Sequence, residues 1–457
     1  MHCLNKMIEV DMSDIPFVSG AKSPEEGGHF EEFCAHPAHF LQRAYKECGE
    51  LAEFDMGGIN TVLMVGPEAH EAVFRVDDIK VSAPEAYQFM VPIFGKGVQY
   101  GAPLDIERQQ LRMHSRGLAS EKMNHYAPII AREAEDWIAD WGDSGELDFY
   151  EGFADLTIKT STHCLLGSEF RYSLTDEFAE LYHTLGAAAD AGGLQDPGAV
   201  KAAYDARDKA RARLEELITE RVEKRRASGE VEMDLLQVYM DATYPDGRHL
   251  TTSEIAGMIV WFMFAGHHTS ANTAAWTLVE MARHPELTQA VVAEVDAVMS
   301  SGQQFDLKIL RRMSKLEGFI REALRVHPPL NTLTRRVMED FEYKGHIIEK
   351  GKNVMLCPYV AHRLESSFED AEAFKPDRPA PESPFALIPF GGGQRKCVGN
   401  AFAILQVKVI FSVLLNNYEF ELAGPSGEYA EIMPSLILRP SDPCILRYRR
   451  RADRKAA

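Results

Sequence analysis

The sequence predicts a mainly α-helical protein with a minor β region, folded as a single domain. Apolar residues recur at helical spacing in the middle of the chain, over residues 127–141, 174–190, 199–227, 251–283, 286–299 and 315–326. Strand-like sequence lies near the two ends, and no repeat, low-complexity tract or clean linker separates the ends from the middle. Distant segments should therefore pair in the same sheets, which is why we expect one domain.

The first strands are predicted over LAEFDMGGINTVLMVG (residues 51–66), around a Gly-Gly turn, and Pro67 is placed to open a helix directly afterwards. Further strands are expected within residues 343–356 and 418–448. Between them, AAADAGGLQDPG (residues 187–198) is a candidate lid or an ordinary surface loop, because small residues and glycines anchor a helix end weakly.

The helix predicted over residues 251–283 has the clearest boundaries. Thr251 and Glu254 have the spacing of a capping box, and Pro285 ends the helix. The first half is apolar almost all round, which predicts burial in the core.

The bulk composition narrows the class of protein. A formal net charge of −20 argues against nucleic acid or an anionic membrane as the main partner, because both bind cationic surfaces. No stretch approaches the ~20 apolar residues that span a bilayer, and the N-terminal residues contain no signal-like apolar run. We therefore expect a soluble, cytoplasmic protein. The seven cysteines are scattered, which argues against a disulfide framework or a zinc cage.

One cysteine stands in a setting that indicates chemistry. The run FGGGQRKCVG (residues 390–399) places Cys397 just before a helix that begins near Asn400. The positive end of the helix dipole stabilises a thiolate there, and a thiolate can bind a metal. The glycines of the run would let the backbone approach a flat ligand closely, and Arg395 would point toward an anion. The alternative is a glycine loop around a buried cysteine.

A second signature lies upstream of this run. Glu322 and Arg325 lie one helical turn apart, so they can pair on one helix face. A buried pair of this kind needs further partners, and Arg378 in FKPDRP can supply one. By itself the pattern is a common helix pair, and its position before the cysteine run makes it specific.

Polar residues interrupt the long helix abruptly, at His267, His268, Thr269 and Ser270. Adjacent histidines point about 100° apart on a helix, so the two rings cannot both face one metal. A threonine in mid-helix can donate to a carbonyl one turn back and open the helix locally to water. The alternative is a pair of satisfied core or surface histidines.

The cysteine run carries a resemblance to a known family. It matches F-x-x-G-x-R-x-C-x-G at Phe390, Gly393, Arg395, Cys397 and Gly399, and on this match the chain resembles the cytochrome P-450 superfamily. The resemblance implies the cytochrome P-450 fold, a single triangular-prism domain. It would cover residues 28–451, between an N-terminal lead of residues 1–27 and a basic tail of residues 452–457.

Two segments are similar to one branch of this superfamily, the sterol 14α-demethylases. AGHHTS (residues 265–270) matches A-G-x-H-T-S, and residues 87–100 match Y-x-x-[FL]-x-x-P-x-F-G-x-x-V-x-[FY]. Two departures concern the substrate. Gly101 stands where the branch favours Asp, and NTLT (residues 331–334) is polar where bacterial members are more apolar. Polar groups facing a sterol need partners, so these departures suggest a polar handle on the substrate or an altered pocket.

The resemblance also implies roles for individual residues. Haem would be the cofactor, with Cys397 as the thiolate ligand to its iron and His268 and Thr269 as an acid and alcohol pair that relays protons. The remaining roles are haem contacts by Arg395, Arg335, Tyr87, Phe390 and Gly391, substrate contacts by Phe89, Phe94, Phe264, Ala265, Leu330 and Thr332, and a structural triad of Glu322, Arg325 and Arg378. Each apolar substrate residue could instead be ordinary core.

We therefore expect a haem-thiolate monooxygenase that uses dioxygen and two electrons to oxidise a hydrophobic substrate, as a sterol 14α-demethylase or close homologue. A hydroxylase of another steroid, terpenoid or lipid is the first alternative. A haem-binding sensor without turnover is the second, and the relay pair argues against it. Electrons should come from a separate ferredoxin and ferredoxin reductase, which could meet basic residues such as Lys396 and Lys408. Azole-type inhibitors are expected to bind.

Overall fold

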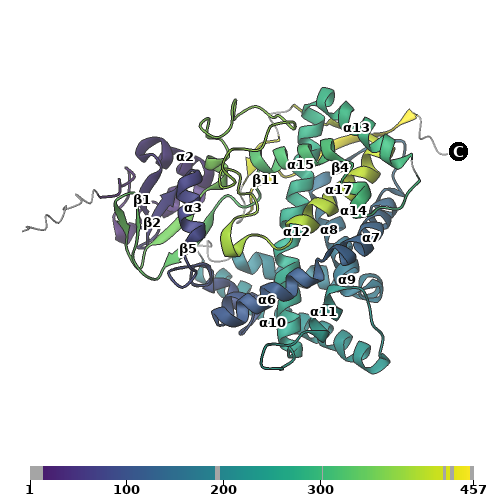
Figure 1. The fold of residues 1–457 in the computed structure, drawn as a ribbon, viewed down its shortest axis with the longest axis horizontal. Helices are drawn as coiled ribbons and strands as arrows, with labels where there is room; N and C mark the ends of the chain where they lie inside the picture. Colours follow the sequence, from purple (N-terminus) through teal and green to yellow (C-terminus); the bar gives the residue numbers. More distant parts are fainter. Residues whose placement is uncertain (1–13, 191–195, 301, 426–428, 433–436, 453–457) are drawn as a thin grey trace, which may run out of the picture. The chain divides into compact units, whose positions relative to one another are not determined.

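A computed structural model describes residues 14–190, 196–300, 302–425, 429–432 and 437–452. Within these ranges most residues are helical and the strands form small sheets (Figure 1), so the prediction of a mainly α fold with a minor β region is confirmed. The chain divides into two compact units, each made of segments distant in sequence. The first unit consists of Met1–Ala86, Asn331–Ala371 and Pro381–Lys396, and the second of Tyr87–Leu330, Glu372–Ala380 and Cys397–Ala457.

The first unit is built on a sheet in the order β1-β2-β8-β5-β3. Its elements are η1 (Pro24–Glu26), α1 (Phe30–Ala35), α2 (Pro37–Cys48), β1 (Leu51–Asp55), β2 (Asn60–Met64), α3 (Pro67–Arg75), β3 (Val81–Ser82), α4 (Ala83–Ala86), β5 (Leu333–Val337), β6 (Phe341–Tyr343), β7 (His346–Ile348), β8 (Asn353–Leu356), α16 (Pro358–Ala361) and η5 (Gly393–Arg395). Strand β2 runs parallel to β8, with Val62 opposite Val354. These side chains pack with Val73 and Phe74 of α3 in one apolar cluster, so α3 is held against the sheet.

The second unit contains the long helices. Its elements are η2 (Gln88–Met90), α5 (Val91–Phe94), η3 (Gln99–Gly101), α6 (Leu104–Gly117), α7 (Ser120–Ile138), β4 (Ser144–Asp148), α8 (Phe149–Leu166), α9 (Ser168–Asp190), α10 (Pro197–Ser228), α11 (Leu235–Asp241), α12 (Thr252–Arg283), α13 (Pro285–Met299), α14 (Leu307–Leu310), α15 (Ser314–Val326), α17 (Asn400–Asn417), β9 (Tyr418–Leu422), β10 (Glu431–Ile432), β11 (Arg439–Pro440) and β12 (Ile445–Arg450). Strand β12 lies between β4 and β9.

Helix α12 lies at the centre of the second unit, where it packs against α8, α10, α15 and α17 (Figure 1). The capping box at its start is present: the Thr251 side chain accepts from the Glu254 N–H, and the Glu254 carboxylate accepts from the Thr251 N–H. Most residues along it are buried, as the apolar first half predicted. Burial on several sides makes α12 a rigid support for the polar residues in its middle.

Helix α7 differs most from its predicted range. It begins at Ser120 and includes Pro128, whereas the pattern placed the start at residue 127. The predicted range rested on the helical spacing of apolar residues. Buried Met123 and Tyr126 hold the seven additional residues against the core, so tertiary packing extends the helix before the proline. The candidate lid is partly helical, because α9 includes residues 187–190 and α10 begins at Pro197, while residues 191–195 lie outside the described residues.

One described helix, α17, is long and apolar enough to cross a membrane. Of this stretch, 72% is buried inside the protein, as in the core helix of a soluble protein. Its composition is therefore weak evidence for a membrane span.

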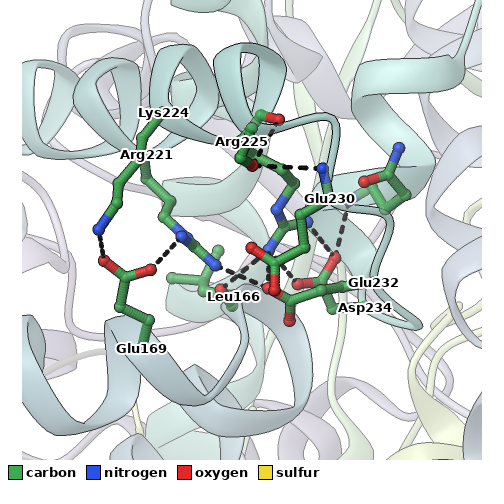
Figure 2. Close-up of polar contacts among 10 residues, drawn as sticks. Leu166, Glu169, Arg221, Lys224, Arg225, Glu230, Glu232 and Asp234 are labelled. Atoms are coloured by element: carbon green, nitrogen blue, oxygen red, sulfur yellow. Dashed lines mark hydrogen bonds and ion pairs between the residues drawn. The ribbon is translucent and has the colours of Figure 1, made fainter.

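A buried ion-pair cluster fixes the C-terminal end of α10 (Figure 2). Both terminal nitrogens of the Arg225 guanidinium donate to Asp234, at 2.8 and 2.6 Å, and the Arg225 side chain has no solvent exposure. Arg221 pairs with Glu169 of α9 at 2.5 Å and with Glu232 at 2.7 Å. Asp234 also accepts from the Gln237 N–H and so caps α11. The carboxylates of Glu169, Glu232 and Asp234 thereby connect α9, α10 and α11.

Candidate functional site

Cys397 lies three residues before the first residue of α17, whose N-cap is Gly399. Solvent reaches the Cys397 side chain. Desolvation by the surrounding protein raises the pKa of its thiol, and a hydrogen bond from the Gly399 N–H acts in the opposite direction. A Cβ at Gly399 would lie 3.8 Å from the sulfur. A sulfur that accepts an amide hydrogen bond at a helix start suits a thiolate ligand to a metal.

Two of the glycines before this cysteine pack closely against Phe74 of α3. A Cβ at Gly392 would lie 2.6 Å from the ring of Phe74, and one at Gly393 would lie 2.3 Å from the Phe74 carbonyl oxygen. These two glycines therefore let the loop pack on α3. Their close approach to a flat ligand stays a prediction. Gly391 has φ +63°. A Cβ there would lie 3.8 Å from the Arg395 carbonyl oxygen and 3.9 Å from the Leu333 side chain, so its surroundings are less crowded than those of Gly392 and Gly393.

The two arginines assigned to the haem propionates lie in the first unit. Arg395 donates from Nε to Asp78 at 3.0 Å, and both side chains are mostly buried. Arg335, on β5, donates to the Thr334 carbonyl oxygen at 2.8 Å and is half-buried. Asp78 was not identified from the sequence, because nothing in its local pattern distinguishes it from a surface aspartate. It fixes the direction of the Arg395 guanidinium.

The structure brings Glu322, Arg325 and Arg378 together in the second unit. Arg325 donates to both Glu322 oxygens, at 2.9 and 2.8 Å, and Arg378 donates to Oε1 at 3.3 Å. Both arginines also donate to the Ala373 carbonyl oxygen, and the Lys375 N–H donates to Glu322 at 2.9 Å. The buried carboxylate thus has several donors, which is the condition for tolerating it.

The surface of α12 opens in the middle of the helix. Ala265 is exposed, and Phe264, Gly266, His268 and Thr269 are half-buried, although residues on either side are buried. A Cβ at Gly266 would meet no atom within 4 Å. The Thr269 hydroxyl donates to the Ala265 carbonyl oxygen at 2.8 Å, the one-turn-back bond that the sequence predicted. A small-residue opening with a hydroxyl at its edge can admit a reactant and water.

The two adjacent histidines have different surroundings. His267 is buried, with Nε2 2.9 Å from the Ala154 carbonyl oxygen. Desolvation, together with the neighbouring His183 and Arg439, lowers the pKa of His268 to about 4. His268 is therefore neutral near pH 7, so it can accept a proton at one ring nitrogen and release one from the other.

The segment over residues 87–101 presents aromatic side chains. Phe89 is 49% exposed, whereas Phe94 is buried with its ring 5.6 Å from that of Phe264. Tyr87 stacks on Tyr100 at 5.4 Å. An exposed phenylalanine beside buried apolar residues is a candidate contact for an apolar ligand.

Buried polar groups hold this segment in place. Gln99 has φ +46°, a strained value for a residue other than glycine, and its N–H donates to Gln110 at 2.8 Å. The Gln99 side-chain nitrogen lies 2.8 Å from Nε2 of His114, and Arg211 of α10 donates to the Phe94 carbonyl oxygen at 3.2 Å. Gln99 occupies an unspecified position of the motif, so this role could not be predicted from the sequence.

The polar segment after Leu330 is only partly as predicted. Leu330 belongs to the second unit, is 37% exposed and bridges to Ile437. Asn331 is buried, and its amide oxygen accepts from the Cys357 thiol at 3.5 Å. The expectation that this amide faces a ligand is therefore wrong. Thr332 and Thr334 are half-buried.

The basic residues proposed as a docking surface differ in exposure. Lys396 is exposed. Lys408 is buried and pairs with Glu317 at 3.0 Å, so the expectation that it meets a partner protein is wrong. A lone lysine in a helix that is apolar on every side should be buried and paired, and this signal was present in the sequence.

A buried histidine with two carboxylate partners was not predicted from the sequence. His327 lies between two carboxylates, 3.0 Å from Glu280 of α12 and 2.6 Å from Glu431 of β10, and its ring stacks on Trp276 at 3.6 Å. It holds the chain just before Leu330 against α12. The His-Pro-Pro sequence shows the end of a helix but not the partners of the histidine.

Comparison with known proteins identifies the family. The cytochrome P450 family model matches residues 27–447, and the chain belongs to the cytochrome P450 family. It is thus a haem-thiolate monooxygenase, which acts on hydrophobic compounds and receives electrons from redox partners. The Cys397 thiol, reached by solvent and bonded to the Gly399 N–H, fits the thiolate ligand that haem requires.

Individual relatives cover nearly the whole chain. A sterol 14α-demethylase of Mycolicibacterium vanbaalenii is 40% identical over 96% of this chain and 99% of its own length. A sterol 14α-demethylase of Mycobacterium bovis is 39% identical over 96% and 98%. A lanosterol 14α-demethylase of Mus musculus is 34% identical over 95% and 89%. The solved structure of retinoic acid-bound cyanobacterial CYP120A1 is 20% identical, with a TM-score of 0.84 over 96% of this chain and all of that chain, and shows the fold.

Proposed function

We propose that this chain is a sterol 14α-demethylase or a close homologue that oxidises a 14α-methyl sterol. The observation that carries the proposal is near-full-length similarity, at 40% identity, to a bacterial protein of that name. Residues 87–100 and 265–270, which match the motifs of that branch, contain the exposed Phe89 and Ala265 in the second unit. Apolar side chains that solvent reaches suit a large apolar substrate.

In this proposal Cys397 ligates the haem iron, and Arg335, Arg395 and Tyr87 hold the propionates. Phe390 and Gly391 would contact the ring. When bound, the haem supplies activation of dioxygen, which the thiolate ligand promotes. The arginines contribute fixed positive charge, since Arg395 is already oriented by Asp78.

The substrate residues we propose are the apolar Phe89, Phe94, Phe264, Ala265 and Leu330, together with Thr332. They would exclude water and orient the sterol. On α12, the Thr269 hydroxyl, tied to the Ala265 carbonyl oxygen, and the neutral His268 would hold and move protons toward the reacting oxygen. Glu322, Arg325 and Arg378 would keep the support around the haem rigid.

A hydroxylase of another steroid, terpenoid or lipid is the second candidate. The half-buried hydroxyls of Thr332 and Thr334 favour it, because they could bind a polar group of a different substrate. A haem-binding sensor without turnover is disfavoured by the opening at Thr269. Replacing Thr269 with alanine should uncouple electron consumption from product in a monooxygenase and leave ligand binding of a sensor unchanged.

The deciding experiment is an optical titration of the purified ferric holoprotein with a 14α-methyl sterol and with smaller steroids and terpenoids. A saturable spin-state shift with the 14α-methyl sterol, followed by formic acid among the products when dioxygen and an electron donor are added, would support demethylation. A shift with another compound alone would replace demethylation by the second candidate.

A pair of phenylalanine variants tests where the substrate binds. Phe89 and Phe17 are equally exposed, at 49%, so Phe89→Ala and Phe17→Ala should cost similar stability. Completing the burial of a half-exposed phenylalanine contributes about 0.8–1.5 kcal/mol, so Phe89→Ala should raise the Kd for the sterol roughly 4- to 12-fold. Phe17→Ala should leave the Kd unchanged. Equal effects of the two variants would exclude Phe89 as a substrate contact.

For the redox partners we propose a small ferredoxin and its ferredoxin reductase. The exposed Lys396 could meet an acidic ferredoxin, and the rate of electron transfer should then fall as salt concentration rises. Azole-type inhibitors should compete with the sterol in the optical titration. We also propose a soluble, cytoplasmic location.

A further inference from the structure

Four aromatic side chains form one cluster between α9 and α12 in the second unit. Tyr182 and His183 are consecutive on α9, and His267 and His268 are consecutive on α12. Ring centroids lie 4.3 Å apart for His267 and His268, 5.9 Å for His183 and His267, and 6.5 Å for His183 and His268. Tyr182 lies 5.2 Å from His267. The three imidazoles therefore share one small region.

Exposure increases along the cluster away from the core. His267 is buried, His268 is half-buried and His183 is exposed. Thr269, which follows His268, is half-buried at the opening of α12. The histidines thus connect solvent to the middle of α12.

Buried atoms of the cluster have unused hydrogen-bonding capacity. Within the described part of the chain, Nδ1 of His267 and the hydroxyl of Tyr182 are buried and have no hydrogen-bond partner. Such atoms are rare in folded proteins and often mark a functional site or an ordered water. Nδ1 of His267 and the Tyr182 hydroxyl therefore lie close to His268 and are free to bind an ordered water.

The groups that face His268 define what it can exchange protons with. Gly186 of α9 presents no side chain, and a Cβ there would lie 3.8 Å from Nε2 of His268. Helix α9 brings Tyr182 and His183, α12 brings His267, and β11 brings Arg439. The pKa of Tyr182 is raised well above its usual value by desolvation, and arginine stays protonated. His183 is therefore the exposed imidazole in this set, and it can exchange protons directly with water.

We propose that His183 is the solvent-side proton donor of the α12 relay and acts through His268. The proposal rests on the proposed function, since monooxygenation consumes the delivered protons. A proton leaves the protonated His183 and binds a ring nitrogen of neutral His268, which releases the proton on its other nitrogen toward the opening at Thr269. His183 then takes a proton from water. No electron moves, and both rings return to their starting charge.

The test uses the full-length holoprotein and three variants. His183→Gln removes the proton carrier, His183→Glu replaces it with another carrier, and Thr184→Ala is a control one residue further along α9. The fraction of consumed electrons recovered in product, and its change in deuterated solvent, are measured with saturating substrate. We expect about a tenfold loss of coupling and a larger solvent isotope effect for His183→Gln, recovery with His183→Glu, and parental values for Thr184→Ala. Because His183 is exposed, all variants should fold and keep the substrate-induced spin-state shift.

A second readout does not depend on turnover. The charge of His183 lowers the pKa of His268, so His183→Gln should raise the pKa of the His268 ring in an NMR titration, whereas Thr184→Ala should not. Parental coupling and isotope effect in His183→Gln would overturn the proposal and leave the proposed function standing. If the parent protein forms no product from any sterol, the proposed function fails. In that case the His268 titration still tests the interaction between His183 and His268, and an unchanged pKa of His268 in His183→Gln would overturn it.

Discussion

Asp234 holds the end of α10 through interactions that can be removed one at a time. Its carboxylate accepts from Arg225 at 2.8 and 2.6 Å and from the Gln237 N–H at 2.8 Å (Figure 2). Replacing Asp234 with alanine would leave the Arg225 guanidinium fully buried without its main partner. Glu232, 3.3 Å from Arg225, would offset part of the loss.

The expected cost follows from these contacts. Breaking a buried ion pair by removing one partner costs about 3–5 kcal/mol, because a charge is left buried and uncompensated. Loss of the N-cap of α11 adds about 1 kcal/mol. Allowing for the remaining contact with Glu232, we expect Asp234→Ala to lower the free energy of unfolding by about 3–5 kcal/mol. Asp234→Asn keeps a good cap and should cost less.

Chemical denaturation of the variants measures these costs, with Asp196→Ala as the matched control. Asp196 caps α10 by accepting from the Gly198 N–H at 2.9 Å but is exposed and has no described ion pair. Its removal should cost about 1 kcal/mol. If Asp234→Ala costs no more than Asp196→Ala, the buried pair contributes no net stability and the reasoning is refuted.

Two further predictions concern the loop glycines and acid stability. Gly393→Ala should destabilise the protein by about 2–5 kcal/mol, because the new Cβ would lie 2.3 Å from the Phe74 oxygen at φ +63°. Gly391→Ala has the same φ, but its Cβ would meet its nearest atoms at ordinary contact distances of 3.8 and 3.9 Å, so it should cost about 1–2 kcal/mol. Equal shifts in melting temperature for the two variants would contradict this prediction. Desolvation raises the pKa of Glu133, but hydrogen bonds from a histidine and from Arg171 bring it below 4.5. The ionised Glu133 carboxylate therefore stabilises the fold above about pH 4.5, and this stabilisation is lost as pH falls. Glu133→Gln should have a lower free energy of unfolding than the parent protein at pH 7. Urea denaturation at several pH values should also show that its free energy of unfolding falls less steeply on acidification.

Local patterns predicted the parts of this fold that depend on near neighbours in sequence. The helix over residues 251–283 had a capping box, an apolar surface and a terminating proline, and the structure has α12 over Thr252–Arg283. The strands around the Gly-Gly turn also formed where predicted. The parallel pairing of β2 with β8 could not be read from the sequence, because it joins segments almost 300 residues apart.

The candidate site likewise contains residues that a local motif predicted and residues that only the fold brings together. Cys397 and the Glu322 pair were visible because the chemistry requires fixed residue types at fixed spacing. The partners that orient site residues were not, since Asp78 meets Arg395 from more than 300 positions away. His183 had no motif at all, and its relevance appears only where α9 brings its ring within 6.5 Å of His268.

The position of Asn331 changes what the polar segment indicates about the substrate. Three polar residues after Leu330, namely Asn331, Thr332 and Thr334, suggested a pocket altered for a polar ligand. Asn331, the most polar of them, is instead bonded to Cys357 in the core of the first unit, where it satisfies a buried thiol. The remaining hydroxyls, of Thr332 and Thr334, can donate to backbone carbonyls, so they impose a weaker requirement for a polar ligand than a free amide would. The sequence departure at this segment therefore carries less weight against a sterol than the matched motifs carry for one.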